Sequence, residues 1–120
     1  AVEREKGRHI VGAGGAETRH GALELGEARP DYVFFGRFGQ DIRAEPHRKN
    51  LQLAEWWASM IEVPCIVMGG HSLDTLGDAA ATGAEFVALS RAVFDEAADP
   101  GAAVAAANET LQDYVLAEVA

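Results

Sequence analysis

The sequence predicts an α/β domain in which four short parallel strands alternate with helices. Three observations support this fold class: four apolar runs recur along the 120 residues, helical stretches separate them, and two of the strand-helix-strand segments repeat each other. The runs do not alternate apolar with polar residues, which is typical of strands covered by helices in a parallel sheet. Alternation of strand and helix favours right-handed crossovers between parallel neighbours.

Each expected element follows from local composition. The strands are the apolar runs that end near glycine or serine, namely His9–Gly12, Tyr32–Gly36, Pro64–Gly69 and Phe86–Ser90. The helices are the longer stretches between and after them, namely Glu17–Gly26, Lys49–Ile61, Leu73–Ala81 and the alanine-rich Ala102–Val119, whose composition has high helix propensity.

An internal repeat supports this order of elements. The segment Gly14–Gly36 parallels Gly69–Ser90, since each has two glycines, a short helix, another glycine and then an acidic-aromatic-valine run. Gly26 and Gly83 are expected to end their helices in the left-handed conformation that glycine adopts without steric cost. Two copies of a strand-helix-strand pair give four parallel strands.

Four strand-helix units are half of a (β/α)₈ TIM barrel, which takes about 250 residues. We therefore predict a single domain over residues 1–120 that forms a half-barrel. Such a half has two open sheet edges and one uncovered apolar face. A missing N-terminal half, a second copy of the chain, or rearrangement into a flavodoxin-like sheet with helices on both faces would cover them. The charged stretch Glu3–Lys6 resembles the tail of a helix that begins earlier, which favours a fragment.

Composition narrows the classes of partner. Lys and Arg number 10 against 19 Asp and Glu, giving a net charge of −9 that repels the phosphates of nucleic acid and anionic lipid. Neither nucleic acid nor a membrane is expected as a partner. The single cysteine, Cys65, cannot form an internal disulfide, and no apolar run is long enough to span a bilayer. We expect a cytoplasmic protein.

The carboxyl ends of the strands are where ligands bind in folds of this class. After the third and fourth strands this edge carries Gly69, Gly70, Ser90 and Arg91. Glycine N–H groups are accessible to an anion, the serine adds a hydroxyl, and arginine offers donors matched to phosphate. The alternative is that the two glycines only form a tight turn and that Ser90 caps the next segment.

A second candidate is the cationic cluster Arg43, His47, Arg48 and Lys49, just before or within the first turn of an expected helix. Positive charge there opposes the helix dipole, and an anionic ligand would reverse that cost. A solvated loop is the equal alternative. Cys65 is expected to be buried and inert, and His71 to be an exposed loop residue. No zinc motif or paired carboxylate is present, so the sequence identifies neither catalytic residues nor a metal site.

Three motifs carry a family resemblance. Residues 83–94, Gly-Ala-Glu-Phe-Val-Ala-Leu-Ser-Arg-Ala-Val-Phe, resemble the last strand of thiamine phosphate synthases and the related thiazole tautomerases. Residues 64–70, Pro-Cys-Ile-Val-Met-Gly-Gly, are similar to the seventh strand, and residues 31–36, Asp-Tyr-Val-Phe-Phe-Gly, to the sixth. The resemblance extends from about residue 8 to residue 114 and implies strands five to eight, the C-terminal half of the (β/α)₈ TIM barrel.

The resemblance implies an enzyme of thiamine biosynthesis that couples hydroxymethylpyrimidine diphosphate to thiazole phosphate and releases pyrophosphate with Mg²⁺ assistance. The thiazole phosphate would be held at Gly69, Gly70, Ser90 and Arg91. The pyrimidine and Mg²⁺ would be held by the first four strands, which this chain does not contain. The implied partners are phosphorylated small molecules and either a missing N-terminal half or further copies of the chain.

Two loops depart from the family pattern. The loop after the sixth strand usually contains Pro-Thr-x-Thr-Lys, whereas here it is Arg37–Arg43, with neither the threonines nor that lysine. After the fifth strand, Ala13–Gly15 stands where the family places Ser and His. Arg43, Arg48 or Lys49 is a candidate for the missing cation. A diverged tautomerase-like barrel that binds a phosphorylated ligand, and a non-catalytic half-barrel that self-associates, remain alternatives.

Overall fold

A computed structural model describes residues 9–119 of the chain, with side chains to residue 114, so the charged stretch Glu3–Lys6 lies outside the described residues. The strands are β1 (Gly12–Gly14), β2 (Tyr32–Phe35), β3 (Cys65–Met68) and β4 (Phe86–Ala88). The helices are α2 (Arg19–Glu27), α3 (Arg48–Met60), the 3₁₀ turn η1 (Leu73–Thr75), α4 (Leu76–Ala80), α5 (Arg91–Phe94) and α6 (Pro100–Val119). No helix among the described residues is long and apolar enough to cross a membrane.

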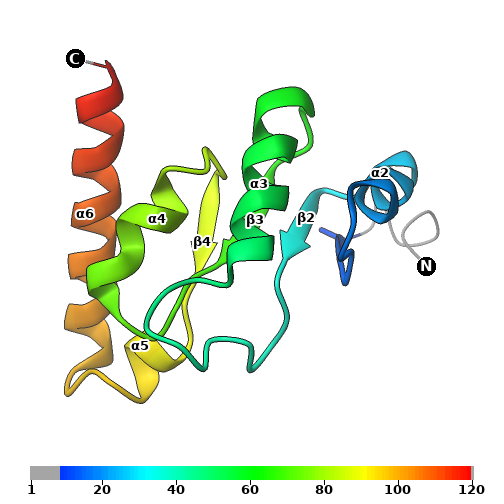
Figure 1. Ribbon diagram of the computed structural model, residues 1–120. Coiled ribbons are helices and arrows are strands. Elements are labelled where there is room, and N and C mark those ends of the chain that lie inside the picture. The colour runs from blue at the N-terminus through cyan, green and yellow to red at the C-terminus, as the bar shows by residue number, and fades with distance from the viewer. Residues whose placement is uncertain (1–8, 120) are drawn as a thin grey trace.

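The four strands form one parallel sheet in the order β1-β2-β3-β4 (Figure 1). This confirms the α/β class with four parallel strand-helix units. Strands that are neighbours in sequence are also neighbours in space, as half of a (β/α)₈ barrel requires. A flavodoxin-like sheet would need a reversal of strand order, so the rearrangement considered from the sequence is wrong.

One face of the sheet carries the core. Val33 and Phe35 of β2 are fully buried, as are Cys65 and Val67 of β3, because alternate residues of a strand share a face. Trp57 of α3 closes this layer: its ring meets that of Phe35 edge-on at a centroid distance of 5.9 Å. Its Nε1 donates to the Val63 carbonyl at 2.7 Å, so the one polar atom of this fully buried ring has a partner.

The opposite face of the sheet is apolar and largely open. The register aligns Phe34, Ile66 and Phe86 across three strands, and Phe86 is 60% exposed. In a (β/α)₈ barrel the corresponding face lines the interior, where side chains from alternate strands pack in layers. The structure therefore has the uncovered apolar face that the sequence predicts for a half-barrel.

The first strand differs from its prediction. The sequence places it at His9–Gly12, whereas β1 spans Gly12–Gly14 and pairs with Tyr32–Phe34. A Cβ on Gly12 would overlap the Tyr32 ring, and a Cβ on Gly14 would lie 3.4 Å from Cβ of Phe34. The strand therefore runs through two glycines that pack against Tyr32 and Phe34, and a side chain at Gly12 would require the Tyr32 ring to move.

The two glycines expected to end helices have different roles. Gly83 has φ +84°, as predicted for a left-handed helix end. Gly26 instead lies inside α2, and a Cβ there would be 2.8 Å from the Trp57 ring, so this glycine lets two helices approach closely. The left-handed residue after α2 is Arg29, with φ 54°.

The third expected helix is divided in two. Ser72 accepts a hydrogen bond from the Asp74 N–H and starts the 3₁₀ turn, and α4 begins only at Leu76. The Thr75 hydroxyl donates to the Ser72 carbonyl at 2.8 Å and approaches the Ala44 carbonyl at 2.7 Å. This contact with the loop after β2 fixes the turn, which explains why a uniform helix is absent.

The ionisation of the Cys65 thiol provides a test of whether this side chain is buried in the core. Its side chain is fully buried, and this burial, with a smaller contribution from the Glu85 charge, raises the pKa of the thiol from 9.0 to about 12. The folded chain thus holds the thiol proton more tightly than the unfolded chain. The associated stability is fully present below pH 9 and is lost as the pH rises towards 12.

We expect the free energy of unfolding to fall more steeply above pH 9 in the parent chain than in Cys65→Ala, measured by urea denaturation at each pH. At neutral pH a thiol reagent should react with Cys65 only as fast as the chain unfolds. Rapid labelling of the folded chain would contradict this burial.

A candidate phosphate-binding rim

The carboxyl ends of β3 and β4 lie side by side. The Gly69 N–H donates to the Ala88 carbonyl at 2.9 Å and so extends the parallel ladder by one step. A Cβ on Gly69 would be 2.7 Å from Cδ2 of Leu89, so a larger residue here would require the end of the Leu89 side chain to move. The structure therefore brings Gly69, Gly70, Ser90 and Arg91 to one edge of the sheet, here called the rim.

A long loop covers this rim. Residues 36–47, here called the strap, connect β2 to α3 and pass below the sheet beside α5 (Figure 1). The N–H groups of His71 and Ser72 donate to the Arg43 and Ala44 carbonyls at 2.9 and 3.2 Å. A Cβ on Gly70 would overlap the Ala44 carbonyl, so the strap backbone lies directly against the double glycine. The loop amides that follow Gly70 are thus already bonded.

Asp41 is the residue of the strap that sequence reasoning missed. Its carboxylate is buried, with a relative exposure of 2%. Its Oδ2 accepts from the backbone N–H of Arg91 at 2.7 Å, and its Oδ1 lies 3.3 Å from Arg91 Nε. Oδ1 has no hydrogen-bond partner among the described residues, so the guanidinium charge alone compensates it. A carboxylate therefore occupies the place where the sequence predicts a phosphate.

Two other groups of the rim, the Ser90 hydroxyl and the exposed part of the Arg91 guanidinium, are available to donate hydrogen bonds to an anion. Ser90 precedes α5 but its hydroxyl makes no capping hydrogen bond. The Arg91 side chain is 44% exposed, so only part of its guanidinium is enclosed by the contact with Asp41. The carboxylate and a ligand phosphate would use the same donors, since both are oxyanions that accept from arginine and backbone N–H groups.

The predicted cationic cluster is divided between two sites. Arg43 and Arg48 line a cavity of about 680 Å³ in the strap, together with Arg37 and His47. This cavity also contains Glu45 as its one acidic lining residue. His47 Nδ1 accepts from the Lys49 N–H at 3.2 Å and caps α3, which ties this end of the strap to the helix.

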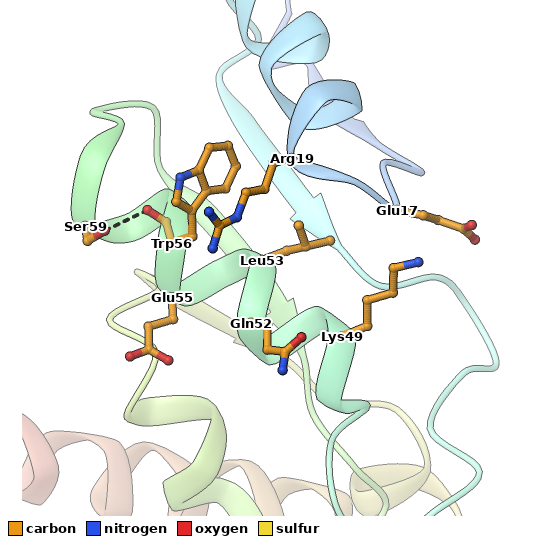
Figure 2. A pocket seen from close by; sticks show the side chains of 8 residues that line it. All are labelled: Glu17, Arg19, Lys49, Gln52, Leu53, Glu55, Trp56 and Ser59. Atoms are coloured by element: carbon orange, nitrogen blue, oxygen red, sulfur yellow. Dashed lines mark hydrogen bonds between the residues drawn. The ribbon is translucent and has the colours of Figure 1, made fainter.

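Lys49 faces a different surface. It lines an open groove of about 730 Å³ between α2 and α3, with Glu17 and Arg19 from the α2 side (Figure 2). The Arg19 guanidinium carbon lies 5.2 Å from the centre of the Trp56 ring, and Trp56 is only partly buried. The side chains that line this groove on the surface of α2 and α3 include both acidic and basic residues. Lys49 therefore does not share the strap cavity with Arg43 and Arg48.

Metal binding has no support from the described residues. Among residues 9–119, no group of three or more His, Cys, Asp or Glu side chains could hold a metal ion. His71, expected to be exposed, is half-buried next to the strap. Among the described residues its ring forms no ion pair or hydrogen bond with an acidic side chain, so we assign it no role in proton transfer.

Comparisons with known proteins agree with the geometry. A family model described as thiamine monophosphate synthase matches residues 1–93. The chain is 36% identical over 104 residues to the thiamine-phosphate synthase of Rhodospirillum centenum, covering 86% of this chain and 50% of that protein. It is 38% identical over 97 residues to the thiamine-phosphate synthase of Erythrobacter litoralis, covering 78% of this chain and 45% of the relative. The chain spans about half the length of these relatives.

Proposed function

Because this chain belongs to the thiamine monophosphate synthase family, we propose that it forms the thiazole-phosphate half of a thiamine phosphate synthase active site. The reaction would couple hydroxymethylpyrimidine diphosphate to thiazole phosphate and release pyrophosphate. The observation that carries this proposal is the parallel register of β3 and β4, which sets Gly69 and Gly70 beside Ser90 and Arg91.

In this proposal the rim binds and orients the thiazole phosphate. The Ser90 hydroxyl donates to a phosphate oxygen, and the Arg91 guanidinium supplies the opposite charge. Arg43 and Arg48 add positive charge from the strap cavity, in place of the lysine that the family pattern has in this loop. Lys49 lies on the α2–α3 groove and is left out of this site.

The other substrate and Mg²⁺ belong to the remainder of the barrel in this proposal. Mg²⁺ would neutralise charge on the departing pyrophosphate. In the part of the chain that the structure describes, no cluster of three or more His, Cys, Asp or Glu side chains could hold a metal ion by itself. We propose that the missing four strands cover the apolar face that carries Phe34, Ile66 and Phe86. The relatives are about twice as long as the matched region, so they have the length for additional strands that would cover this face.

The rim is tested by titrating thiazole phosphate into the full chain and an Arg91→Ala variant. We expect Arg91→Ala to weaken binding by about tenfold or more, because a charge-assisted hydrogen bond to phosphate is lost. Arg19→Ala is the matched control, since it removes an arginine from the α2–α3 groove and should bind as the parent does. Equal affinity of the full chain and both variants for thiazole phosphate would show that Arg91 is not part of the binding site.

A tautomerase-like activity on a phosphorylated ligand is the second candidate. It is favoured by the strap, which contains Arg37–Arg43 in place of the threonines and lysine of the synthase pattern and which lies closed on the rim. An assay of pyrophosphate release with both synthase substrates separates the two activities, because a tautomerase releases none.

Self-association without catalysis is the remaining alternative, favoured by the exposed apolar face alone. Light scattering of the chain tests it directly. A homodimer or larger oligomer that releases no pyrophosphate and binds no thiazole phosphate would support this alternative, whereas a stable monomer would contradict it.

A further inference from the structure

We propose that Asp41 is a latch that occupies the anion position at Arg91, and that a ligand phosphate enters the rim by displacing this carboxylate. The inference rests on the proposed phosphate rim and adds a residue that determines its affinity and selectivity. It follows from three features of the strap, namely the burial of Asp41, the identity of its donors and the way in which the strap is held on either side of it.

The burial of Asp41 indicates that its contact with Arg91 is a specific part of the fold. The carboxylate is 2% exposed, although the flanking Ile42 is 68% exposed and Phe38 is 94% exposed. A strap that places apolar side chains in solvent and a carboxylate inside is not arranged by hydrophobic burial. The interaction with Arg91, 50 residues away in sequence, is what holds the carboxylate there.

The donors of Asp41 are those that a phosphate would need. Arg91 gives its backbone N–H to Oδ2, and its Nε lies next to Oδ1. Because Oδ1 accepts no hydrogen bond from the described residues, the carboxylate is incompletely satisfied. A buried charge in this condition is held less firmly than a fully bonded one, so a phosphate with more acceptor oxygens can compete for Arg91.

The strap has separate anchors on both sides of Asp41. The Asn50 amide donates to Gln40 Oε1 at 2.7 Å, and Asn50 is itself buried in α3. On the other side, the Arg43 and Ala44 carbonyls accept from His71 and Ser72. The carboxylate can therefore leave Arg91 while the rest of the strap stays in place, and Gly39, with φ +84° and open space around its Cα, provides local freedom.

The test compares the full chain with Asp41→Asn, which keeps the size of the side chain and one acceptor but removes its charge. Titration with inorganic phosphate, followed through the Arg91 amide signal by NMR, should give about tenfold tighter binding or more in Asp41→Asn. Without phosphate, the Arg91 N–H should exchange with solvent at least about tenfold faster in this variant, because a charge-assisted bond has been weakened. The Ile61 N–H, which donates to Trp57 at 2.8 Å in α3, should exchange at the parent rate.

Two further variants make the comparison specific. Asp113→Asn removes the same charge from the exposed surface of α6 and should match the parent in both measurements. Asp41→Glu restores the charge and should return the weak affinity for phosphate. If Asp41→Asn loses the Ile61 protection, Asp41→Glu still tests the latch, because tight phosphate binding by that variant would overturn it.

Failure of the latch and failure of the rim give different results. Equal phosphate affinity in the parent, Asp41→Asn and Asp41→Glu would overturn the latch and leave the rim intact. Absence of phosphate binding from all of these proteins would overturn the rim and with it the competition, and Asp41 would then be only a structural tie between the strap and the turn after β4.

Discussion

Replacing Trp57 by alanine is expected to lower the free energy of unfolding by about 3–5 kcal/mol, the range for large aromatic residues truncated in a core. The side chain is fully buried between α3 and the sheet, and its ring meets Phe35. The variant also leaves the Val63 carbonyl without its 2.7 Å donor. Urea denaturation followed by circular dichroism measures this loss without relying on tryptophan fluorescence.

The adjacent tryptophan is the matched control. Trp56 is only partly buried and packs on the Arg19 guanidinium at the surface groove. Trp56→Ala should therefore cost clearly less, in the range of about 1–2 kcal/mol, because less apolar area returns to water. Equal losses in the two variants would contradict the assignment of Trp57 to the core and Trp56 to its margin.

Replacing Gly70 by alanine is expected to destabilise the closed strap and to lower the free energy of unfolding by about 1–3 kcal/mol, the usual cost of overpacking. The new Cβ would overlap the Ala44 carbonyl and lie 2.6 Å from the carbonyl carbons of Ala44 and Glu45. These are backbone atoms, which cannot move aside as a flexible side chain would. The strap must therefore lift, and the bonds from His71 and Ser72 to its carbonyls should weaken.

Hydrogen exchange at His71 and Ser72, combined with urea denaturation, measures both parts of this prediction. Gly77→Ala in α4 is the control, because no atom lies within 4 Å of its added Cβ. That variant should be as stable as the parent or more stable by about 0.5–1 kcal/mol, since alanine favours the helix. Unchanged exchange at His71 and Ser72 in Gly70→Ala would contradict the close contact between strap and rim.

The sequence predicted the parts of the fold that depend on local patterns. The apolar runs of β2, β3 and β4 identified their strands, and the amphipathic stretch before Ile61 identified α3 to within one residue at each end. The parallel direction of the strands followed from their alternation with helices, whereas only the observed order β1-β2-β3-β4 excludes the flavodoxin-like alternative. These features are local because a continuous apolar run and a capped helix are recognised from neighbouring residues alone.

The misassigned elements depend on contacts that are distant in sequence. The strand β1 was displaced because its glycines accommodate the Tyr32 and Phe34 side chains of the next strand. Gly26 was assigned to a helix end because its contact with Trp57, 31 positions later in the printed sequence, has no local signal. The expected single helix at Leu73–Ala81 is divided in the structure, where the Thr75 hydroxyl lies 2.7 Å from the Ala44 carbonyl of the strap.

The candidate site was predicted only in outline. Glycine and arginine chemistry identified Gly69, Gly70, Ser90 and Arg91, and the parallel sheet brings them to one edge. Asp41 could not be found in this way, because an acidic residue in a loop that also contains arginines usually stays in solvent. Lys49 was grouped with Arg43 and Arg48 by adjacency, although successive residues at a helix start point in different directions.

A crystal structure of the full chain with thiazole phosphate bound tests the central claim most directly. We expect the phosphate to lie between the double glycine and the Ser90–Arg91 turn, with the Asp41 carboxylate no longer bonded to the Arg91 N–H. Phosphate bound in the α2–α3 groove, or at the rim with Asp41 still on Arg91, would contradict the account.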